Sequence, residues 1–220
     1  MTYRLCALVG VAVLGSGLAL AAVDNFNRPN GPLGADWTAV SGTWRIENNM
    51  ARSSTGAATD LAIYNALQTA NALVGADVFY LGGSRITYAA LVSGYTSASN
   101  TVFIKVQDNN GNGDFERVFF YFGNNGSPWP GMTGGPSFVD VTPFTQARLW
   151  TVLSGNSITL NIDRDMNGVP EDVLTRGGLP SLGTSGGLGG YSNAAFDNFV
   201  MTPEPASLAL LAAVALLRRR

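Results

Sequence analysis

The chain has 220 residues, with a single cysteine, no histidine and a formal net charge of −2. Without histidine it cannot form a Ser-His-Asp triad or a Cys-His pair, and it lacks the usual His ligands of zinc sites. The acidic balance argues against nucleic acid or an anionic membrane surface as a partner.

The first 21 residues have the three-part pattern of an export signal. Arg4 supplies a positive charge, residues 5–20 form an apolar stretch, and Ala19-Leu20-Ala21 matches an A-x-A cleavage site. We predict a secretory signal peptide over residues 1–21, with a helical apolar region, which a signal peptidase removes before Ala22.

Residues 22–202 are long enough for one domain with its own core. Polar and apolar residues alternate from Ser157 to Asp163, as in a half-buried antiparallel strand, and no segment shows a helical stripe. The run at 118–122 is continuously apolar and predicts a central strand covered on both sides. Further strands are expected at 43–47, 60–64, 76–81, 85–92, 101–107, 147–153 and 195–201. Because 24 of the 27 glycines fall in this segment, between the expected strands, the pattern predicts an all-β sandwich or barrel.

The two ends of this segment carry similar aromatic motifs. They are Asp24-Asn25-Phe26-Asn27-Arg28 with Leu33-Gly34, Trp37 and Gly42-Thr43-Trp44-Arg45-Ile46 at the start, and Gly189-Gly190-Tyr191 with Phe196-Asp197-Asn198-Phe199 at the close. Together they resemble the first and last strands of concanavalin A-like, laminin-G-like jelly rolls. The resemblance implies an antiparallel jelly-roll β-sandwich in which the two Asp-Asn-Phe-containing segments are neighbours. That family includes lectins, glycan-binding modules, hydrolases and structural modules, so the fold alone selects no function.

Two polar loops have a spacing that can aim several oxygen atoms at one Ca²⁺ ion. The first offers Asp163, Asp165, Asn167, Glu171 and Asp172, and the second offers Asp108, Asn110, Asn112 and Asp114, each with a glycine at the sixth position. The twelfth position, which is Leu174 or Phe119, departs from the EF-hand pattern. The alternative is that Asn, Asp and Gly simply form hairpin turns. Ca²⁺ is the only cofactor that the sequence indicates, and the first loop, with more carboxylates, is the stronger candidate.

A third loop is the candidate recognition surface. Trp129 lies between two prolines, and its ring could stack on a sugar while Asn124 and Asn125 bond hydroxyl groups. The alternative, which we favour, is that Trp129 covers the edge of the sandwich. The other tryptophans, at positions 37, 44 and 150, are expected in the core. Lys105 is expected to be a solvated lysine on the same strand face as Thr101 and Gln107.

An enzymatic function is not indicated. Retaining glycosidases of the laminarinase type in this fold carry Glu-x-Asp-x-x-Glu on one strand, which places two carboxyl groups at the required spacing. This triplet is absent, and the segment's three glutamates, Glu47, Glu116 and Glu171, lie in separate segments. We therefore predict a protein without catalytic residues.

The C-terminus forms a second targeting pattern over residues 203–220. Pro203-Glu204-Pro205 is followed by an apolar run from Ala206 to Leu217, and the chain closes on Arg218, Arg219 and Arg220. This order resembles the PEP-CTERM sorting signal, which an exosortase recognises and removes at the inner membrane of Gram-negative bacteria. As a helix, 12 residues reach about 18 Å, well short of the roughly 30 Å hydrocarbon core, so only transient insertion is expected. The alternative is a short apolar helix that packs on the domain.

The sequence thus predicts an exported, non-catalytic protein of the cell surface or extracellular matrix, sorted by exosortase through the inner membrane of a Gram-negative bacterium. The alternative hypothesis is a carbohydrate-binding, lectin-like module that engages an exopolysaccharide, with or without calcium. A third hypothesis is a glycan-active enzyme.

Overall fold

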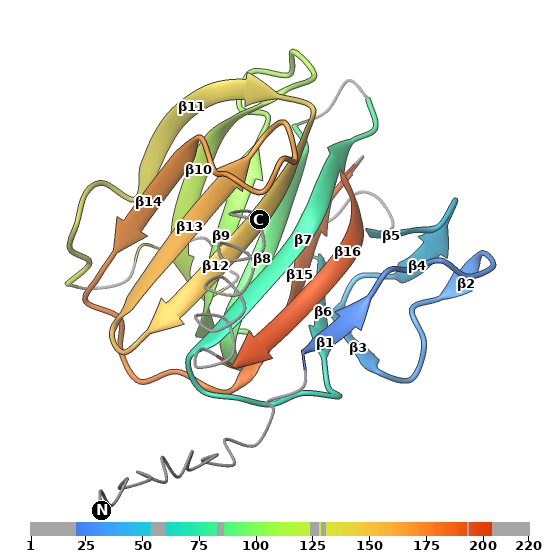
Figure 1. Ribbon diagram of the computed structural model, residues 1–220, viewed down its shortest axis with the longest axis horizontal. Coiled ribbons are helices and arrows are strands. Elements are labelled where there is room, and N and C mark those ends of the chain that lie inside the picture. Colours follow the sequence, from blue (N-terminus) through green and yellow to red (C-terminus); the bar gives the residue numbers. More distant parts are fainter. Residues whose placement is uncertain are drawn as a thin grey trace, which may run out of the picture.

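The computed structural model describes residues 21–53, 60–82, 86–123, 128, 131–192 and 194–203, and within them the regular elements are β-strands in two sheets packed face to face (Figure 1). In spatial order, sheet A contains β14 (Asp172–Arg176), β13 (Ser157–Asp163), β12 (Gln146–Ser154), β7 (Ala72–Tyr80), β16 (Ala194–Pro203), β5 (Met50–Ser53), β4 (Trp44–Glu47) and β2 (Gly31–Pro32), with β1 (Ala22–Asp24) also beside β16. Sheet B contains β11 (Phe138–Phe144), β10 (Phe115–Phe122), β9 (Asn100–Gln107), β8 (Tyr88–Ser97), β15 (Ser185–Tyr191), β6 (Asp60–Tyr64) and β3 (Trp37–Ser41). The expected all-β sandwich is confirmed.

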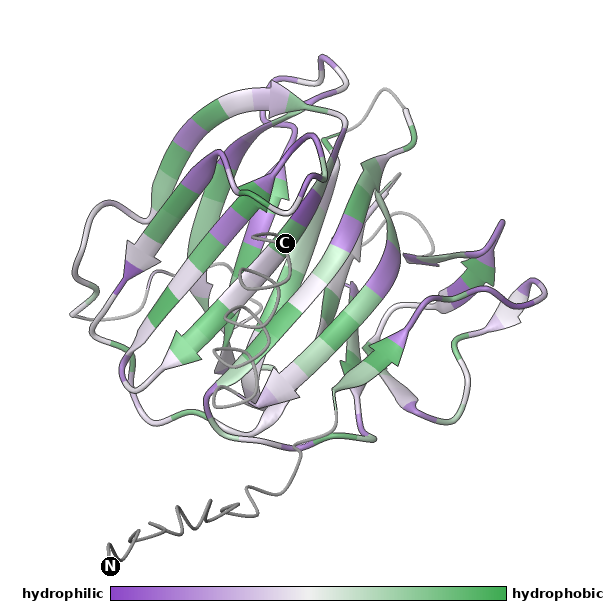
Figure 2. Cartoon of the chain, in the orientation of Figure 1, coloured by the Kyte–Doolittle hydropathy of each residue, from purple (hydrophilic) through white to green (hydrophobic). Residues whose placement is uncertain are grey.

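Period-two alternation builds the core between the sheets. On β13, Ile158, Leu160 and Ile162 are fully buried and point inward, while the residues between them point to the other face. Figure 2 shows how hydrophobic and hydrophilic residues alternate along the strands of sheet A. Each sheet therefore has an inner, apolar face and an outer face available for other tasks.

The terminal strands are neighbours, as the resemblance implied. β1 pairs antiparallel with β16, and Asp24 lies opposite Phe199. The Asp24 carboxylate accepts hydrogen bonds from the Trp37 indole N–H at 2.8 Å and from the Phe26 amide at 2.9 Å, and it also binds the Arg28 guanidinium. The opening Asp-Asn-Phe motif thus fixes the N-terminal segment onto the last strand.

Three expectations about individual elements were wrong. The strand expected at 76–81 is β7 and begins four residues earlier, at Ala72, because its pairing with β16 continues to Pro203. The apolar run 118–122 lies on β10, one strand from the edge of sheet B, and only Val118 and Phe120 in it are fully buried. Trp150 is not a core residue: its side chain lies half-buried on the outer face of sheet A, whereas Trp37 and Trp44 are buried as expected.

Both expected terminal helices fall in residues 1–20 and 204–220, outside the described residues. In the part of the chain that the structure describes, no helix has the length and apolar character needed to cross a membrane. β16 ends at Pro203, the first residue of the sorting motif; Glu204, Pro205 and the three terminal arginines lie beyond it.

Candidate functional site

The outer face of sheet B carries a cluster of aromatic side chains, which we call the aromatic face. The strands of this sheet have apolar residues on both faces, so the inner set joins the core and the outer set forms a second apolar cluster. The aromatic face consists of Tyr88, Phe103, Lys105, Phe119, Tyr121, Phe138 and Tyr191, from β8, β9, β10, β11 and β15.

The strand register places these residues in rows. Phe119 lies opposite Phe138 on one side and Lys105 on the other. Tyr121 lies opposite Phe103 in the next row. Directly opposed residues of antiparallel strands point to the same face, so side chains far apart in the sequence meet here.

The rings form a nearly continuous apolar surface. Phe119 stacks on Tyr121 with ring centroids 5.5 Å apart, and Phe138 lies 6.0 Å from Phe119. On the other side, Tyr88 stacks on Tyr191 at 5.7 Å. Between the two stacks lies Phe103, whose ring approaches Gly189 so closely that a β-carbon at that glycine would lie 2.3 Å from it.

Exposure increases across this surface toward β11. Phe103 is 2% exposed and Tyr88 is also buried, whereas Phe119 and Tyr121 are half-buried. Phe138 is 46% exposed. The surface that a ligand can reach therefore lies over β10 and β11.

The sequence led us to expect Lys105 in solvent, and this was wrong. Lys105 lies at the centre of the aromatic face. Its ammonium nitrogen is 4.7 Å from the ring centroids of Tyr88 and Phe119 and 5.2 Å from that of Tyr121. Burial lowers the pKa of Lys105 to about 8. The rings attract the charged form of Lys105, but burial has the larger effect on its pKa. The amine can still donate hydrogen bonds within these apolar surroundings.

A polar rim borders the exposed side of the aromatic face. Arg117 on β10 donates a hydrogen bond from Nε to Asp140 on β11, and its guanidinium lies 4.8 Å from the Phe138 ring centroid. The hydrogen bond to Asp140 is the largest cause of the raised pKa of Arg117. The rim thus holds a fixed planar cation, with a carboxylate beside it, next to the exposed rings.

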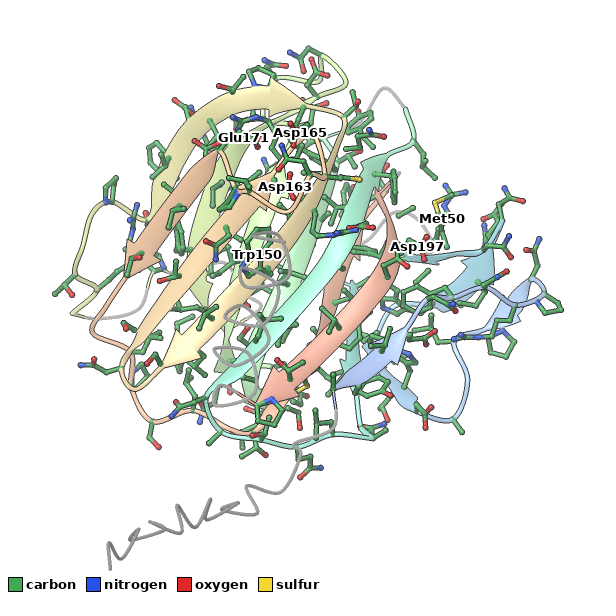
Figure 3. All side chains as sticks on the ribbon, viewed as in Figure 1. Met50, Trp150, Asp163, Asp165, Glu171 and Asp197 are labelled. Atoms are coloured by element: carbon green, nitrogen blue, oxygen red, sulfur yellow. The ribbon has the colours of Figure 1, made fainter. Side chains whose placement is uncertain are left out.

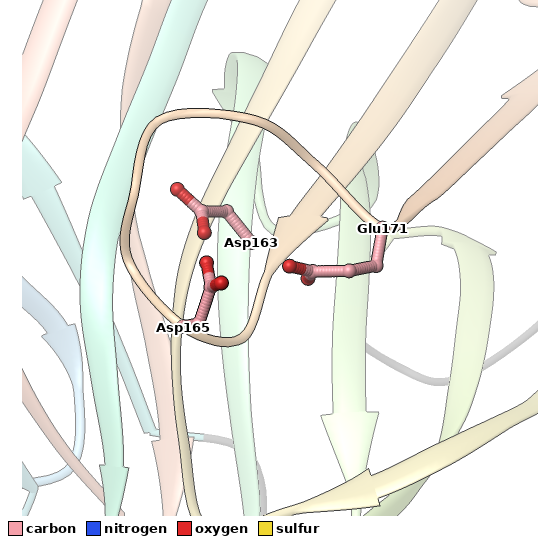
Figure 4. A group of neighbouring side chains, drawn as sticks. All are labelled: Asp163, Asp165 and Glu171. Carbon is pink, nitrogen blue, oxygen red and sulfur yellow. The ribbon is translucent and has the colours of Figure 1, made fainter.

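The second candidate is the loop from Asp163 to Glu171, which we call the acidic loop (Figure 4). The carboxylate oxygens of Asp163, Asp165 and Glu171 lie within 4.8 Å of one another. Asp163 accepts backbone N–H bonds from Asn167 at 3.1 Å and Gly168 at 2.7 Å. Three carboxylates at positions one, three and nine fit a Ca²⁺ site, because hard cations bind oxygen ligands and the loop already holds these close together.

Two of the residues predicted for that site have other partners. Asp172 is the first residue of β14 and pairs with the Arg164 guanidinium, so it lies outside the group of three carboxylates. The Asn167 side-chain amide donates to Asp165 at 2.7 Å, and its oxygen accepts the Val169 N–H. Of the residues predicted for this site, those whose carboxylates lie together are therefore Asp163, Asp165 and Glu171.

The other loop that was predicted to bind a metal forms the same kind of turn as the acidic loop, but its carboxylates form no such group among the described residues. Asp108 accepts three backbone N–H bonds and one from the Tyr80 hydroxyl at 3.0 Å. Burial acts to raise the pKa of Asp108, but these hydrogen bonds outweigh it and leave the pKa below its ordinary value. The oxygens of Asn110 and Asn112 accept N–H groups two residues on, and Asp114 joins no acidic cluster among the described residues. The turn interpretation explains this loop.

The predicted recognition residues Trp129, Asn124 and Asn125 lie outside the described residues. The aromatic face was not identified from the sequence, although its signal was present in the alternation of Phe119 and Tyr121 on β10. Because Phe120 and Phe122 are also aromatic, the sequence did not show that every second ring faces away from the core.

A scan of the sequence against models of known families, and a search among curated proteins, gave no match. Among solved structures, the chain is similar to the CBM2 module of the evolved Dit of Lactobacillus casei BL23 phage J-1, with a TM-score of 0.54 and 14% identity over 82% of this chain and 93% of that one. It is also similar to the Ca²⁺-bound exoplasmic/lumenal domain of VIP36, with a TM-score of 0.50 and 13% identity over 83% and 89% of the two chains. The chain is also similar to a mutant of the GH43 protein BlXynB from Bacillus licheniformis, with a TM-score of 0.54 and 17% identity over 82% of this chain but 39% of that one. At such identities these similarities show the fold alone.

Proposed function

We propose that this protein is an exported, non-catalytic carbohydrate-binding module. The observation that carries the proposal is the aromatic face, where the half-buried rings of Phe119 and Tyr121 lie beside the exposed Phe138. Such a platform suits a sugar, because one face of a pyranose ring presents C–H groups that pack against an aromatic ring. The similarity in fold to the CBM2 module is consistent with this role and adds no evidence on the ligand.

The polar groups around the platform are suited to hydroxyl recognition. The Lys105 amine can donate hydrogen bonds, and the Arg117–Asp140 pair offers both donors and acceptors at the rim. Apolar packing with a few placed polar groups is the usual composition of a small-molecule site. The ligand class is therefore a neutral or acidic polysaccharide whose sugar rings lie flat on β10 and β11.

The same face supports binding more than catalysis. Glycoside hydrolysis requires two carboxyl groups that flank the scissile bond. Among the described residues of the aromatic face and its rim, Asp140 is the one carboxylate, and it is bound to Arg117. We therefore assign these residues to ligand recognition.

In this proposal, the two terminal signals direct the export and sorting of the module. A signal peptide over 1–21 and a PEP-CTERM-like tail over 203–220 would deliver the module to the cell surface or the extracellular matrix. Calcium at the acidic loop is a second, separate candidate property, favoured by the close approach of its three carboxylates.

The test is retention on immobilised polysaccharides, after a glycan array has selected the ligand. Phe119→Ala and Tyr121→Ala should each weaken binding about 10-fold, which corresponds to about 1.4 kcal/mol. Val173→Ala, which shortens an exposed side chain on β14 of the other sheet, is the matched control and should bind normally. Wild-type affinity in both aromatic variants, with melting curves that confirm folding, would refute the proposal.

A further inference from the structure

The outer face of sheet A contains an apolar groove of about 300 Å³, lined chiefly by Leu73, Gly75, Trp150, Val200 and Thr202. Trp150, Gly75 and Val200 form one row across β12, β7 and β16. The next row brings Leu73 opposite Thr202. The groove therefore runs along β7, with Gly75 as its floor.

The groove can receive one face of a helix. The backbones at Trp150 and Val200 lie two strand spacings apart, about 9.6 Å, while a helix with its side chains is about 10–12 Å across, so the helix would lie on the sheet with one row of side chains in the groove. Gly75 carries no side chain, so this row can reach the sheet surface between Trp150 and Val200. Thr202, at the edge of the groove, is 4% exposed, and its hydroxyl lacks a hydrogen-bond partner among the described residues.

One end of the groove is acidic. The row beyond Gly75 holds Asp77 and Asp197, and Arg148 donates to Asp77 at 2.7 Å. Gly168 of the acidic loop also lines the groove, so the carboxylates of that loop lie at the same end. Figure 3 shows Trp150 below Asp163, Asp165 and Glu171, with Asp197 to its right, beyond β7, on the sheet that faces the viewer.

We propose that this groove binds the protein's own C-terminal segment, residues 206–217, before the tail is removed. β16 ends at Pro203, beside Thr202, so the chain reaches the last described residue at the apolar end of the groove. In this proposal, Glu204 and Pro205 would connect β16 to the bound segment. The segment that follows is apolar except for Ser207 and continues to Leu217.

Length and charge fit this occupant. The distance along β7 from the Leu73 row to the Asp77 row is four residues, about 14 Å, and a 12-residue helix is about 18 Å long. The three terminal arginines would therefore lie at the acidic end, near Asp197 and the acidic loop. This arrangement keeps an apolar segment out of water until a membrane competes for it, and it does not depend on sugar binding at the opposite face.

The experiment uses the full-length chain, purified without detergent, with a photo-crosslinking amino acid in place of Leu211. Irradiation should join this position to β7, β12 or β16 of the same chain. Val200→Asp, which places a charge in the groove wall, should reduce this product several-fold. Val173→Asp, an equivalent change at an exposed position on β14, should leave it unchanged.

Crosslinks to the aromatic face, crosslinks only between two copies, or a yield unchanged by Val200→Asp would each overturn the proposal. Circular dichroism melting of both valine variants distinguishes loss of docking from loss of folding. A second groove variant, Trp150→Ala, serves if Val200→Asp does not fold, and it should also reduce the crosslink to the same strands.

Discussion

At the residue scale, the basic side chains on the outer faces of the two sheets differ in their neighbours and in their chemistry. Lys105 is the one lysine of the chain, and the surrounding rings of Tyr88, Phe119 and Tyr121 remove much of its contact with water. Arg148, on sheet A, keeps a side chain 44% exposed and gains a bidentate contact with Asp77. A delocalised guanidinium suits that paired position, whereas a small ammonium can lose its proton when buried.

The pH dependence of stability should report the Lys105 environment. Its pKa is about 8 in the folded protein against an ordinary value of 10.5, so between these values the unfolded chain holds a proton that the folded chain has released. The free energy of unfolding attributable to Lys105 should therefore rise with pH from about 8 to 10.5 and be lowest below pH 8. Urea unfolding of the wild type and of Lys105→Met at pH 7.5 and pH 10 measures this difference directly.

An NMR titration of the Lys105 ε-carbon provides the control for that experiment. A midpoint near pH 8 is expected. A midpoint at or above pH 10, or a stability difference between wild type and Lys105→Met that does not change with pH, would show that the rings leave the ammonium effectively solvated.

At the element scale, the two polar loops share one turn design but differ in which carboxylates they bring together. In each loop, the first Asp accepts backbone N–H groups from later residues of the same loop. The Glu at the ninth position accepts the backbone N–H of the second residue at 2.7 Å, from Asn109 in one loop and Arg164 in the other. Glycines 113 and 168, at the sixth position, adopt the left-handed conformation that this turn requires. The difference lies at position three, where Asp165 supplies a carboxylate and Asn110 does not.

Calcium should therefore stabilise the protein through the acidic loop alone. A ligand present at about 100 times its dissociation constant adds roughly 2.7 kcal/mol to the free energy of unfolding, which is visible as a rise in melting temperature. The rise should disappear in a double variant, Asp165→Asn with Glu171→Gln. Asp114→Asn in the other loop is the matched control and should retain it. Identical melting curves in millimolar calcium and in chelator would show that the acidic loop is an ordinary turn.

At the scale of the whole molecule, the two outer faces are suited to different tasks. The aromatic face belongs to sheet B, while the groove and both ends of the described domain belong to sheet A. Ala22 lies directly opposite Met201, so the two predicted processing sites leave the sandwich side by side (Figure 1). Both predicted processing sites therefore lie at strands of sheet A, on the other sheet from the aromatic face.

Mass spectrometry of the protein from its native host should detect both processing events. The mature chain is expected to begin near Ala22 and to end near Pro203-Glu204-Pro205, because the two terminal patterns resemble the signals that signal peptidase and exosortase recognise. Recovery of a surface protein that still carries Arg220 would contradict removal of the tail. Deletion of the exosortase should leave the full C-terminus in place.

The sequence by itself determined the features that depend on local pattern. Alternation along β13 is enough to predict a half-buried strand. The terminal patterns are also local, and the export and sorting that they indicate stay predictions. The acidic loop was also found locally, because a tight turn links ligand positions only a few residues apart.

Tertiary structure decided everything that depends on strand pairing. Tyr121, Phe103 and Tyr88 meet only through the register of sheet B, and Trp150, Gly75 and Val200 form a groove only because β12, β7 and β16 are adjacent. Alternation defines two faces for each strand, but which strands are neighbours is set by packing of the whole core, and no local pattern contains that information.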